Sequence, residues 1–101
     1  MLWLGDNDYL RESDWNTWTG ICYRFTHGKS LKELQPLFAN IHNYTIWDDH
    51  DYRPNDADRG FTHKEKTLKA FPVSCSNPGY GTKNLRGICI SFQWADVEFF
   101  Y

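Results

Sequence analysis

Two short acidic segments each adjoin a run of apolar, strand-forming residues. The first, GDNDY at residues 5–9, follows Met1–Leu4 directly, and the second, WDDHDY at residues 47–52, begins on the last residue of another run, Asn43–Trp47. Carboxylates gathered at one place repel one another unless a cation or protons neutralise them. The pattern therefore predicts a metal site, and the alternative is a pair of solvated turns rich in Asp and Asn.

The segment between the two runs has helical periodicity. From Ser13 to Thr26 bulky residues recur at spacings of three and four, which predicts a helix with an aromatic core face rather than a platform for sugars or bases. Gly28 should end this helix, Ser30 and Glu33 form a capping-box pattern for the next, and Pro36 predicts a kink or a restart. The residues of the predicted face are Trp15, Trp18, Cys22 and Phe25.

The order strand, two helical pieces, strand is typical of a crossover that joins parallel neighbours in one sheet. The continuous apolar run Met1–Leu4 predicts a central strand buried on both faces. The carboxyl ends of parallel strands lie along one sheet edge, where open α/β folds bind ligands. Neighbouring strands about 4.8 Å apart would bring Asp6 and Asp49 close enough to share two metals about 3.5 to 4 Å apart.

Downstream of the second acidic segment the sequence predicts loops, a helix and a β-hairpin. Thr62 and Glu65 form a capping-box pattern that opens the helix, which should end near Ala70 because Pro72 follows. The complete chain is thus predicted to be α/β, with a parallel β-α-β unit and a C-terminal hairpin. The remaining predicted elements are a loop at Arg53–Gly60, a loop at Asn77–Gly87, strands at Ile88–Gln93 and Val97–Tyr101, and a turn at residues 94–96.

Composition limits the size of the domain and its partners. A chain of 101 residues forms at most one small domain, and its five Trp, seven Phe and six Tyr predict an aromatic core. The formal charge of −2 provides no basic patch for nucleic acid. Cys22, Cys75 and Cys89 lack disulfide or zinc spacing and are interpreted as small core residues. No apolar stretch is long enough to span a membrane, and no signal peptide is visible. The sequence therefore does not indicate a cellular compartment.

Other acidic and hydrolytic motifs are absent from the sequence. Frames that start at Asp6, Asp49 or Asp56 lack the Gly that an EF-hand loop requires at its sixth position. The sequence contains no HExxH, no GxxxxGK[ST] and no GxSxG. These absences argue against a zinc peptidase, a P-loop enzyme and a serine hydrolase.

The acidic segments do resemble one known family. GDNDY fits a GDxxY motif, and WDDHDYRPNDADR at residues 47–59 looks like the signature of the alkaline phosphatase D (PhoD-like) metallophosphatases, relatives of calcineurin-like phosphoesterases and purple acid phosphatases. GDxxY alone is a weak signal, whereas the second block is strong. The similarity extends in family order through KEKTL at 64–68, NPGYG at 77–81 and FQWADVEFF at 92–100.

The resemblance implies a two-metal phosphoesterase site. Asp6 would bridge two metals, and Tyr9 would be a phenolate ligand of ferric iron. Asp49 stands where the wider superfamily has an Asn metal ligand, and His50 where a histidine contacts the phosphoryl oxygen. The implied pair is iron with calcium, with manganese, magnesium or zinc as other options. The alternatives are a packed aromatic for Tyr9 and an exposed loop histidine for His50.

The charged neighbours of these residues have two interpretations each. Asp48 and Asp51 are either outer carboxylates that orient ligands or turn residues. Arg53, Arg59 and Lys83 would either hold a substrate phosphate or be solvated loop charges.

The resemblance also predicts an incomplete site. Arg53 and Ala95 stand where the family pattern has Gly, so the loops there are expected to differ. Residues 1–101 match an internal part of the family's longer, often exported catalytic domain, so the expected fold is a partial metallophosphoesterase sandwich whose flanking strands and further ligands lie elsewhere. The expected function is metal-dependent hydrolysis of phosphate mono- or diesters. The alternative is a truncated or degenerate non-catalytic copy that binds at most a cation or a protein partner.

Overall fold

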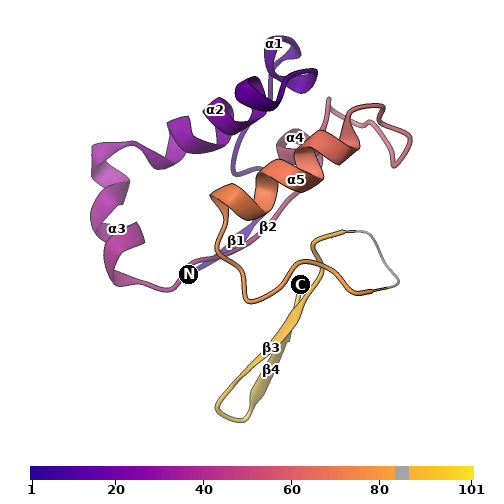
Figure 1. Cartoon of the computed structure of the whole chain (residues 1–101). Helices are drawn as coiled ribbons and strands as arrows, with labels where there is room; N and C mark the ends of the chain where they lie inside the picture. Colours follow the sequence, from indigo (N-terminus) through magenta and orange to yellow (C-terminus); the bar gives the residue numbers. More distant parts are fainter. Residues whose placement is uncertain (84–86) are drawn as a thin grey trace.

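A parallel pair of strands and an antiparallel hairpin flank the helices of this mixed α/β chain (Figure 1). The computed structural model describes residues 1–83 and 87–101. None of the described helices is long and apolar enough to cross a membrane. The elements are β1 (Leu2–Leu4), α1 (Glu12–Trp15), α2 (Trp18–Lys29), the 3₁₀ turn η1 (Lys32–Leu34), α3 (Gln35–Asn40), β2 (Tyr44–Ile46), α4 (Asp49–Tyr52), α5 (Lys64–Ser74), β3 (Ser91–Trp94) and β4 (Val97–Phe100).

The parallel β-α-β unit is confirmed. β1 pairs with β2 in parallel, with Leu2 opposite Tyr44 and Leu4 opposite Ile46. The chain crosses from one strand to the other through α1, α2, η1 and α3. Both strands therefore end at the same sheet edge, and both acidic segments begin there.

The predicted burial of β1 on both faces is wrong. Trp3 stacks on Phe38 of α3, so the helices cover this face of the strand. Leu4 points to the other face and is 72% exposed, and Leu2 is also exposed. The helices thus cover the face that carries Trp3, whereas the face that carries Leu4 is largely open.

The predicted single helix over residues 13–26 is two helices. Thr17 separates α1 from α2, and its side-chain oxygen accepts a hydrogen bond from Gly20 N at 3.1 Å. This cap restarts the helical phase, so Ile21 and Phe25 form the buried face of α2. Trp18, predicted on the core face, is 43% exposed.

The capping box predicted from Ser30 and Glu33 does not form. Ser30 instead ends α2, and its hydroxyl donates to His27 O at 2.7 Å. The predicted restart at Pro36 is confirmed, because this residue lies in the first turn of α3. A missing N–H removes no helical hydrogen bond at that position.

The prediction that α5 ends before Pro72 is also wrong, and Thr62 does not cap it. The helix starts after His63 and continues through Pro72 to Ser74. Phe71 is buried against Phe25, with ring centroids 6.2 Å apart at 87°, and its carbonyl still accepts from Cys75 N at 2.9 Å. Packing of Phe71 and this last hydrogen bond hold the turn that proline weakens.

The core lies mainly between α2 and α5, with one residue from the segment before β3. The predicted strand Ile88–Gln93 is shorter than expected, because β3 begins at Ser91 and Ile88 is in the core instead. Cys75 is buried as predicted, Cys22 is half-buried, and Cys89 is exposed. The buried hydrophobic residues are Leu10, Ile21, Phe25, Ala70, Phe71, Cys75 and Ile88.

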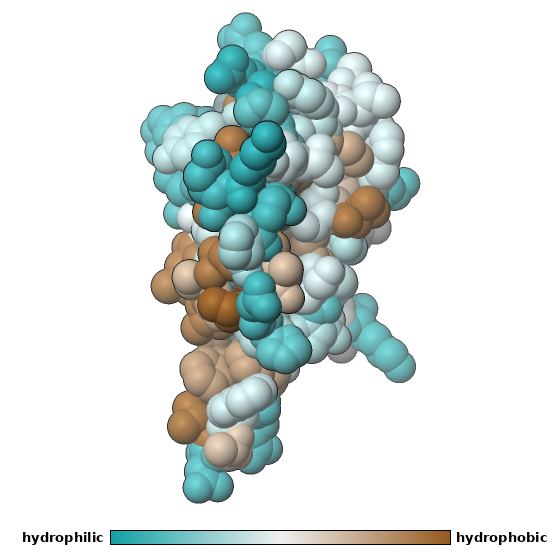
Figure 2. Space-filling model, turned by 90° about the vertical axis from the view of Figure 1, so that its left-hand side faces the viewer, coloured by the Kyte–Doolittle hydropathy of each residue, from teal (hydrophilic) through white to brown (hydrophobic). Residues whose placement is uncertain are grey.

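The C-terminal hairpin is confirmed and projects from the helical part (Figure 1). Ala95 in its turn has a φ of 52°, a left-handed conformation that favours Gly, which is the residue of the family pattern at this position. Trp94, Val97 and Phe100 are exposed. Figure 2 shows apolar side chains gathered over the lower half of the molecule, toward this hairpin.

The predicted loops flank α5. The segment Arg53–Gly60 contains no helix or strand, as expected. The loop predicted at residues 77–87 includes 84–86, which lie outside the described residues.

Candidate metal centre

Three side chains from the two acidic segments meet at the carboxyl edge of the parallel sheet. Potential ligand atoms of Asp6, Asp49 and His50 all lie within 4.8 Å of one another. Asp6 comes from the segment after β1, while Asp49 and His50 come from α4 after β2. The prediction that the two acidic segments converge is therefore confirmed, and these residues form the Asp6–Asp49–His50 cluster.

A glycine allows the two segments to approach closely. Gly5 has a φ of +107°, and a Cβ built on it would lie 2.7 Å from Asp48 Cβ. The next residue, Asp6, has a left-handed φ of 51°, which is uncommon for a residue with a side chain. The backbone thus adopts unusual angles at the point where it turns Asp6 toward α4.

The one-turn helix α4 was not predicted from the sequence. Asp48 caps it by accepting a hydrogen bond from Asp49 N at 2.8 Å, and Asp51 accepts from Asp48 N at 3.1 Å. Two carboxylates three residues apart form a reciprocal cap of this kind, so the spacing of Asp48 and Asp51 in DDHD carried a signal for the helix. Asp48 is exposed, and its observed role is that of a turn residue.

Asp51 ties the two acidic segments together. Its carboxylate accepts hydrogen bonds from Asp8 N at 2.5 Å, Asn7 Nδ2 at 3.2 Å and Asp48 N at 3.1 Å. The residue is only 1% exposed, and burial raises its pKa despite these backbone hydrogen bonds. Asp51 is outside the cluster, and its contacts position the loop that carries Asp6.

The carboxylate of Asp49 is stabilised as an anion. It accepts hydrogen bonds from Asp56 N and from His50 N, each at 2.8 Å. The bond from Asp56 N is the largest influence that holds the pKa of Asp49 below its usual value. Asp49 therefore presents a charged oxygen donor to the cluster at neutral pH.

Tyr9 borders the cluster. Its hydroxyl donates to Asp6 Oδ2 at 2.9 Å, and its ring stacks on His50 with centroids 4.4 Å apart. The side chain is exposed, so it is not a buried core aromatic. The hydrogen bond to Asp6 raises the pKa of Tyr9, because it stabilises the protonated phenol.

The basic residues predicted near the site have different environments. The Arg53 guanidinium lies 5.6 Å from the centroid of the Tyr52 ring, and its charge contributes to the lowered pKa of Asp49. The φ of Arg53 is −166°, so its side chain causes no strain where the family pattern has Gly. Arg59 and Lys83 are exposed.

Comparison with models of known protein families, with curated proteins and with solved structures found no match for this chain.

Sequence reasoning missed an ion pair between a buried carboxylate, Asp8, and a partly exposed lysine, Lys29. Asp8 is 7% exposed and pairs with Lys29 of α2 at 3.2 Å. These residues are 21 positions apart, and only the packing of α2 against the first acidic segment brings them together. The position of Asp8 beside Gly28, which leaves room for its carboxylate, is likewise a tertiary feature.

We expect Asp8→Asn to change how stability depends on pH. Burial raises the pKa of Asp8 from 3.8 to about 6, against the opposing effect of Lys29. Below pH 3.8 this group is protonated in both states, but between 3.8 and about 6 only the folded state retains the proton. The contribution of Asp8 to the free energy of unfolding is therefore lost as the pH rises. The free energy of unfolding of Asp8→Asn minus that of the wild type should rise by about 1 to 3 kcal/mol between pH 3.5 and pH 7.5. Urea unfolding at the two pH values measures this difference.

Asp14→Asn is the matched control for this pH experiment. Burial raises the pKa of Asp14, but hydrogen bonds from the Arg11 amide and from Arg24 outweigh it, and the pKa is lowered. Its contribution to stability is lost as the pH falls, so this variant should show the opposite trend. Parallel pH profiles for wild type and Asp8→Asn would contradict the prediction.

Proposed function

We propose that this chain is part of a metal-dependent phosphoesterase, and that Asp6, Asp49 and His50 bind its catalytic cation. The observation that carries the proposal is the convergence of these three side chains, within 4.8 Å, at the carboxyl edge of parallel strands. Open α/β folds bind their ligands at this edge. The resemblance of residues 47–59 to the PhoD-like signature supports the same function, and with it a partial metallophosphoesterase sandwich as the fold.

The donor set suits a hard or borderline cation. Two carboxylates and an imidazole are ligands of iron, manganese and zinc, and carboxylates also bind calcium and magnesium. The anionic state of Asp49 favours binding of a cation. Tyr9 would first have to lose its hydroxyl proton, which it donates to Asp6, before its phenolate oxygen could be a ligand. The described residues therefore provide a set for one cation, and a pair of iron and calcium ions needs further donors.

The chain's own residues suggest distinct roles in hydrolysis. A bound cation would supply Lewis-acid activation of the attacking water and of the phosphoryl group. Asp6, Asp49 and His50 would hold that cation through two carboxylates and an imidazole nitrogen. The Tyr9 ring, stacked on His50, would fix the orientation of the imidazole. Arg53 is the basic side chain whose charge reaches Asp49, so it is our candidate for phosphate binding.

A non-catalytic cation-binding copy is the second candidate. It is favoured by the small donor set of the described residues, which comprises one three-residue cluster. In this case the chain binds a cation without turning over an ester, and the exposed apolar hairpin contacts a protein partner.

Asp6→Asn is expected to weaken Mn²⁺ binding at least about tenfold, which is about 1.4 kcal/mol. Asn tolerates the left-handed backbone of this residue but removes a charged ligand. The measurement is calorimetric titration with Mn²⁺ together with hydrolysis of bis(p-nitrophenyl) phosphate. Asp56→Asn is the matched control, because Asp56 has a φ of 56°, is exposed and lies outside the cluster.

The outcomes separate the two candidate functions. Mn²⁺-dependent hydrolysis that is lost in Asp6→Asn and retained in Asp56→Asn supports the phosphoesterase. Binding without hydrolysis supports the non-catalytic copy. If Mn²⁺ binds equally to both variants, or not at all to the wild type, the cluster is not a cation site and both candidates fail.

A further inference from the structure

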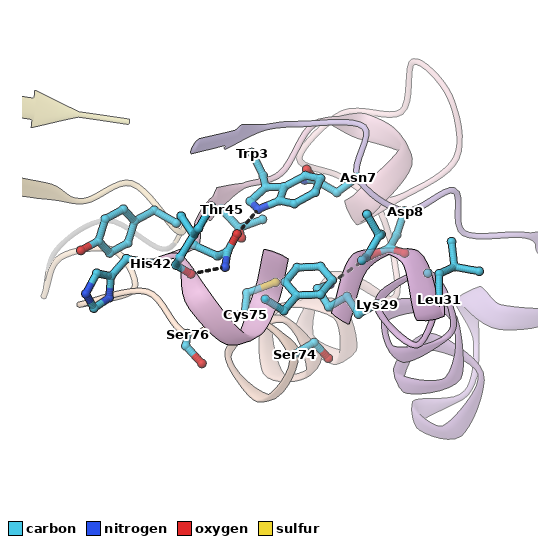
Figure 3. A pocket seen from close by; sticks show the side chains of 16 residues that line it. Trp3, Asn7, Asp8, Lys29, Leu31, His42, Thr45, Ser74, Cys75 and Ser76 are labelled. Carbon is cyan, nitrogen blue, oxygen red and sulfur yellow. Dashed lines mark hydrogen bonds and ion pairs between the residues drawn. The ribbon is translucent and has the colours of Figure 1, made fainter. Parts of the chain in front are cut away.

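A cavity of about 500 Å³ lies between the sheet and the helices (Figure 3). Its wall is formed by the helix-facing side of β1 and β2, the end of α2, η1, α3 and the end of α5. Asn7 and Asp8 line it, whereas the three residues of the Asp6–Asp49–His50 cluster do not. The cavity is therefore a second site, separated from the candidate metal centre by the first acidic segment.

The walls of this cavity are aromatic and aliphatic. The rings of Trp3 and Phe38 stack with centroids 5.8 Å apart and an interplanar angle of 24°. Leu31, Leu34 and Ile41 extend this apolar surface along η1 and α3. The indole N–H of Trp3 is already bonded to Asn43 at 2.9 Å. These walls suit a flat, apolar ring.

One polar side chain at the cavity has unused hydrogen-bonding capacity. The Lys29 ammonium donates to Asp8 Oδ2 at 3.2 Å and to Phe25 O at 3.3 Å. An ammonium has three N–H donors, so among the described residues one donor of Lys29 has no acceptor. This donor marks where a polar group of a ligand would bind.

The charges at the cavity are balanced. Asp8 and Lys29 neutralise each other within the protein, so a charged ligand would find no free counter-ion at this end. His42, the other ionisable base in the wall, is exposed at the surface. The balance favours a ligand without net charge.

We propose that this cavity binds an uncharged aromatic molecule of one or two rings that carries a hydroxyl or carbonyl group. The ring lies against Trp3 and the leucines, and the oxygen binds Lys29 Nζ. Pockets of this volume, with apolar walls and a few polar groups, are typical sites for small molecules. This proposal is independent of the proposed phosphoesterase function, because it uses none of the residues of the cluster.

The test is an NMR titration of the ¹⁵N-labelled chain with 2-naphthol. Saturable shifts are expected at the Trp3 indole N–H and at the Gly28 and Ser76 amides, with a Kd below about 1 mM. The anion 2-naphthalenesulfonate, which has the same rings, should bind at least about tenfold more weakly because its charge is not balanced. Equal or tighter binding of the sulfonate would overturn the uncharged-ligand proposal.

Variants that fill the cavity provide the decisive comparison. Leu34→Trp should abolish the binding of 2-naphthol, and Leu31→Trp, placed at the exposed rim, should do the same if the first variant does not fold. Val73→Trp is the matched control, because Val73 is 73% exposed on α5 and does not line the cavity. Unchanged binding to a folded Leu34→Trp or Leu31→Trp, or the absence of saturable shifts in the wild type, would overturn the proposal.

Discussion

Gly5→Ala is expected to lower the free energy of unfolding by about 3 to 5 kcal/mol and to weaken cation binding at the Asp6–Asp49–His50 cluster. The added Cβ would lie 2.7 Å from Asp48 Cβ and 3.3 Å from Asp48 N, at a φ of +107° that residues with side chains rarely adopt. Relief of the contact requires the first acidic segment to move away from α4. Chemical unfolding measures the first effect, and Mn²⁺ titration measures the second.

Gly87→Ala is the control for this prediction. A Cβ at Gly87 meets nothing within 4 Å. The free energy of unfolding of Gly87→Ala should differ from that of the wild type by less than about 0.5 kcal/mol. If Gly5→Ala were as stable as Gly87→Ala and bound Mn²⁺ like the wild type, the close approach of Gly5 to Asp48 would not exist in solution.

Asp51→Asn is expected to destabilise the chain by about 3 to 5 kcal/mol, although it changes only one atom. The buried carboxylate accepts hydrogen bonds on both oxygens, from Asp8 N on one and from Asn7 Nδ2 and Asp48 N on the other. An amide keeps one acceptor and places a donor against the remaining donors. The loop that carries Asp6 should loosen, which the unfolding midpoint and amide hydrogen exchange at Asp8 will both measure.

The control for Asp51→Asn is Asp96→Asn, because Asp96 is exposed in the hairpin turn, far along the chain from the cluster. Asp96→Asn should leave both the free energy of unfolding and the rate of amide hydrogen exchange at Asp8 nearly unchanged. Similar stability for the two variants would show that the hydrogen bonds of Asp51 do not hold the acidic segments together.

Local sequence signals predicted the elements that depend on neighbouring residues. Alternating and continuous apolar runs indicated β1, β2 and the hairpin, and the order of elements indicated the parallel pairing. Pro36 indicated the restart of α3 because a missing N–H removes no helical hydrogen bond in a first turn. The strands and the restart follow from backbone geometry over a few residues, and the parallel pairing follows from the order of elements.

The incorrect predictions involve competition between a local signal and distant packing. Pro72 normally ends a helix, but burial of Phe71 against Phe25 keeps α5 intact for another turn. Ser30 matched a capping pattern, yet its hydroxyl closes α2 on His27. β1 has the composition of a strand buried on both faces, but its actual burial depends on what packs against each face of the sheet.

By itself, the sequence determined that acidic residues follow two strands, which is a local pattern, and that the strands run parallel, which follows from the order of strands and helices along the chain. The tertiary structure alone decided that Asp49 faces Asp6 while Asp51 supports the loop from behind. Asp8 N and the Asp51 carboxylate are 43 residues apart, and only burial in a shared core brings them into contact. Five similar aspartates at residues 6, 8, 48, 49 and 51 thus have different roles, because their burial and hydrogen-bond partners differ.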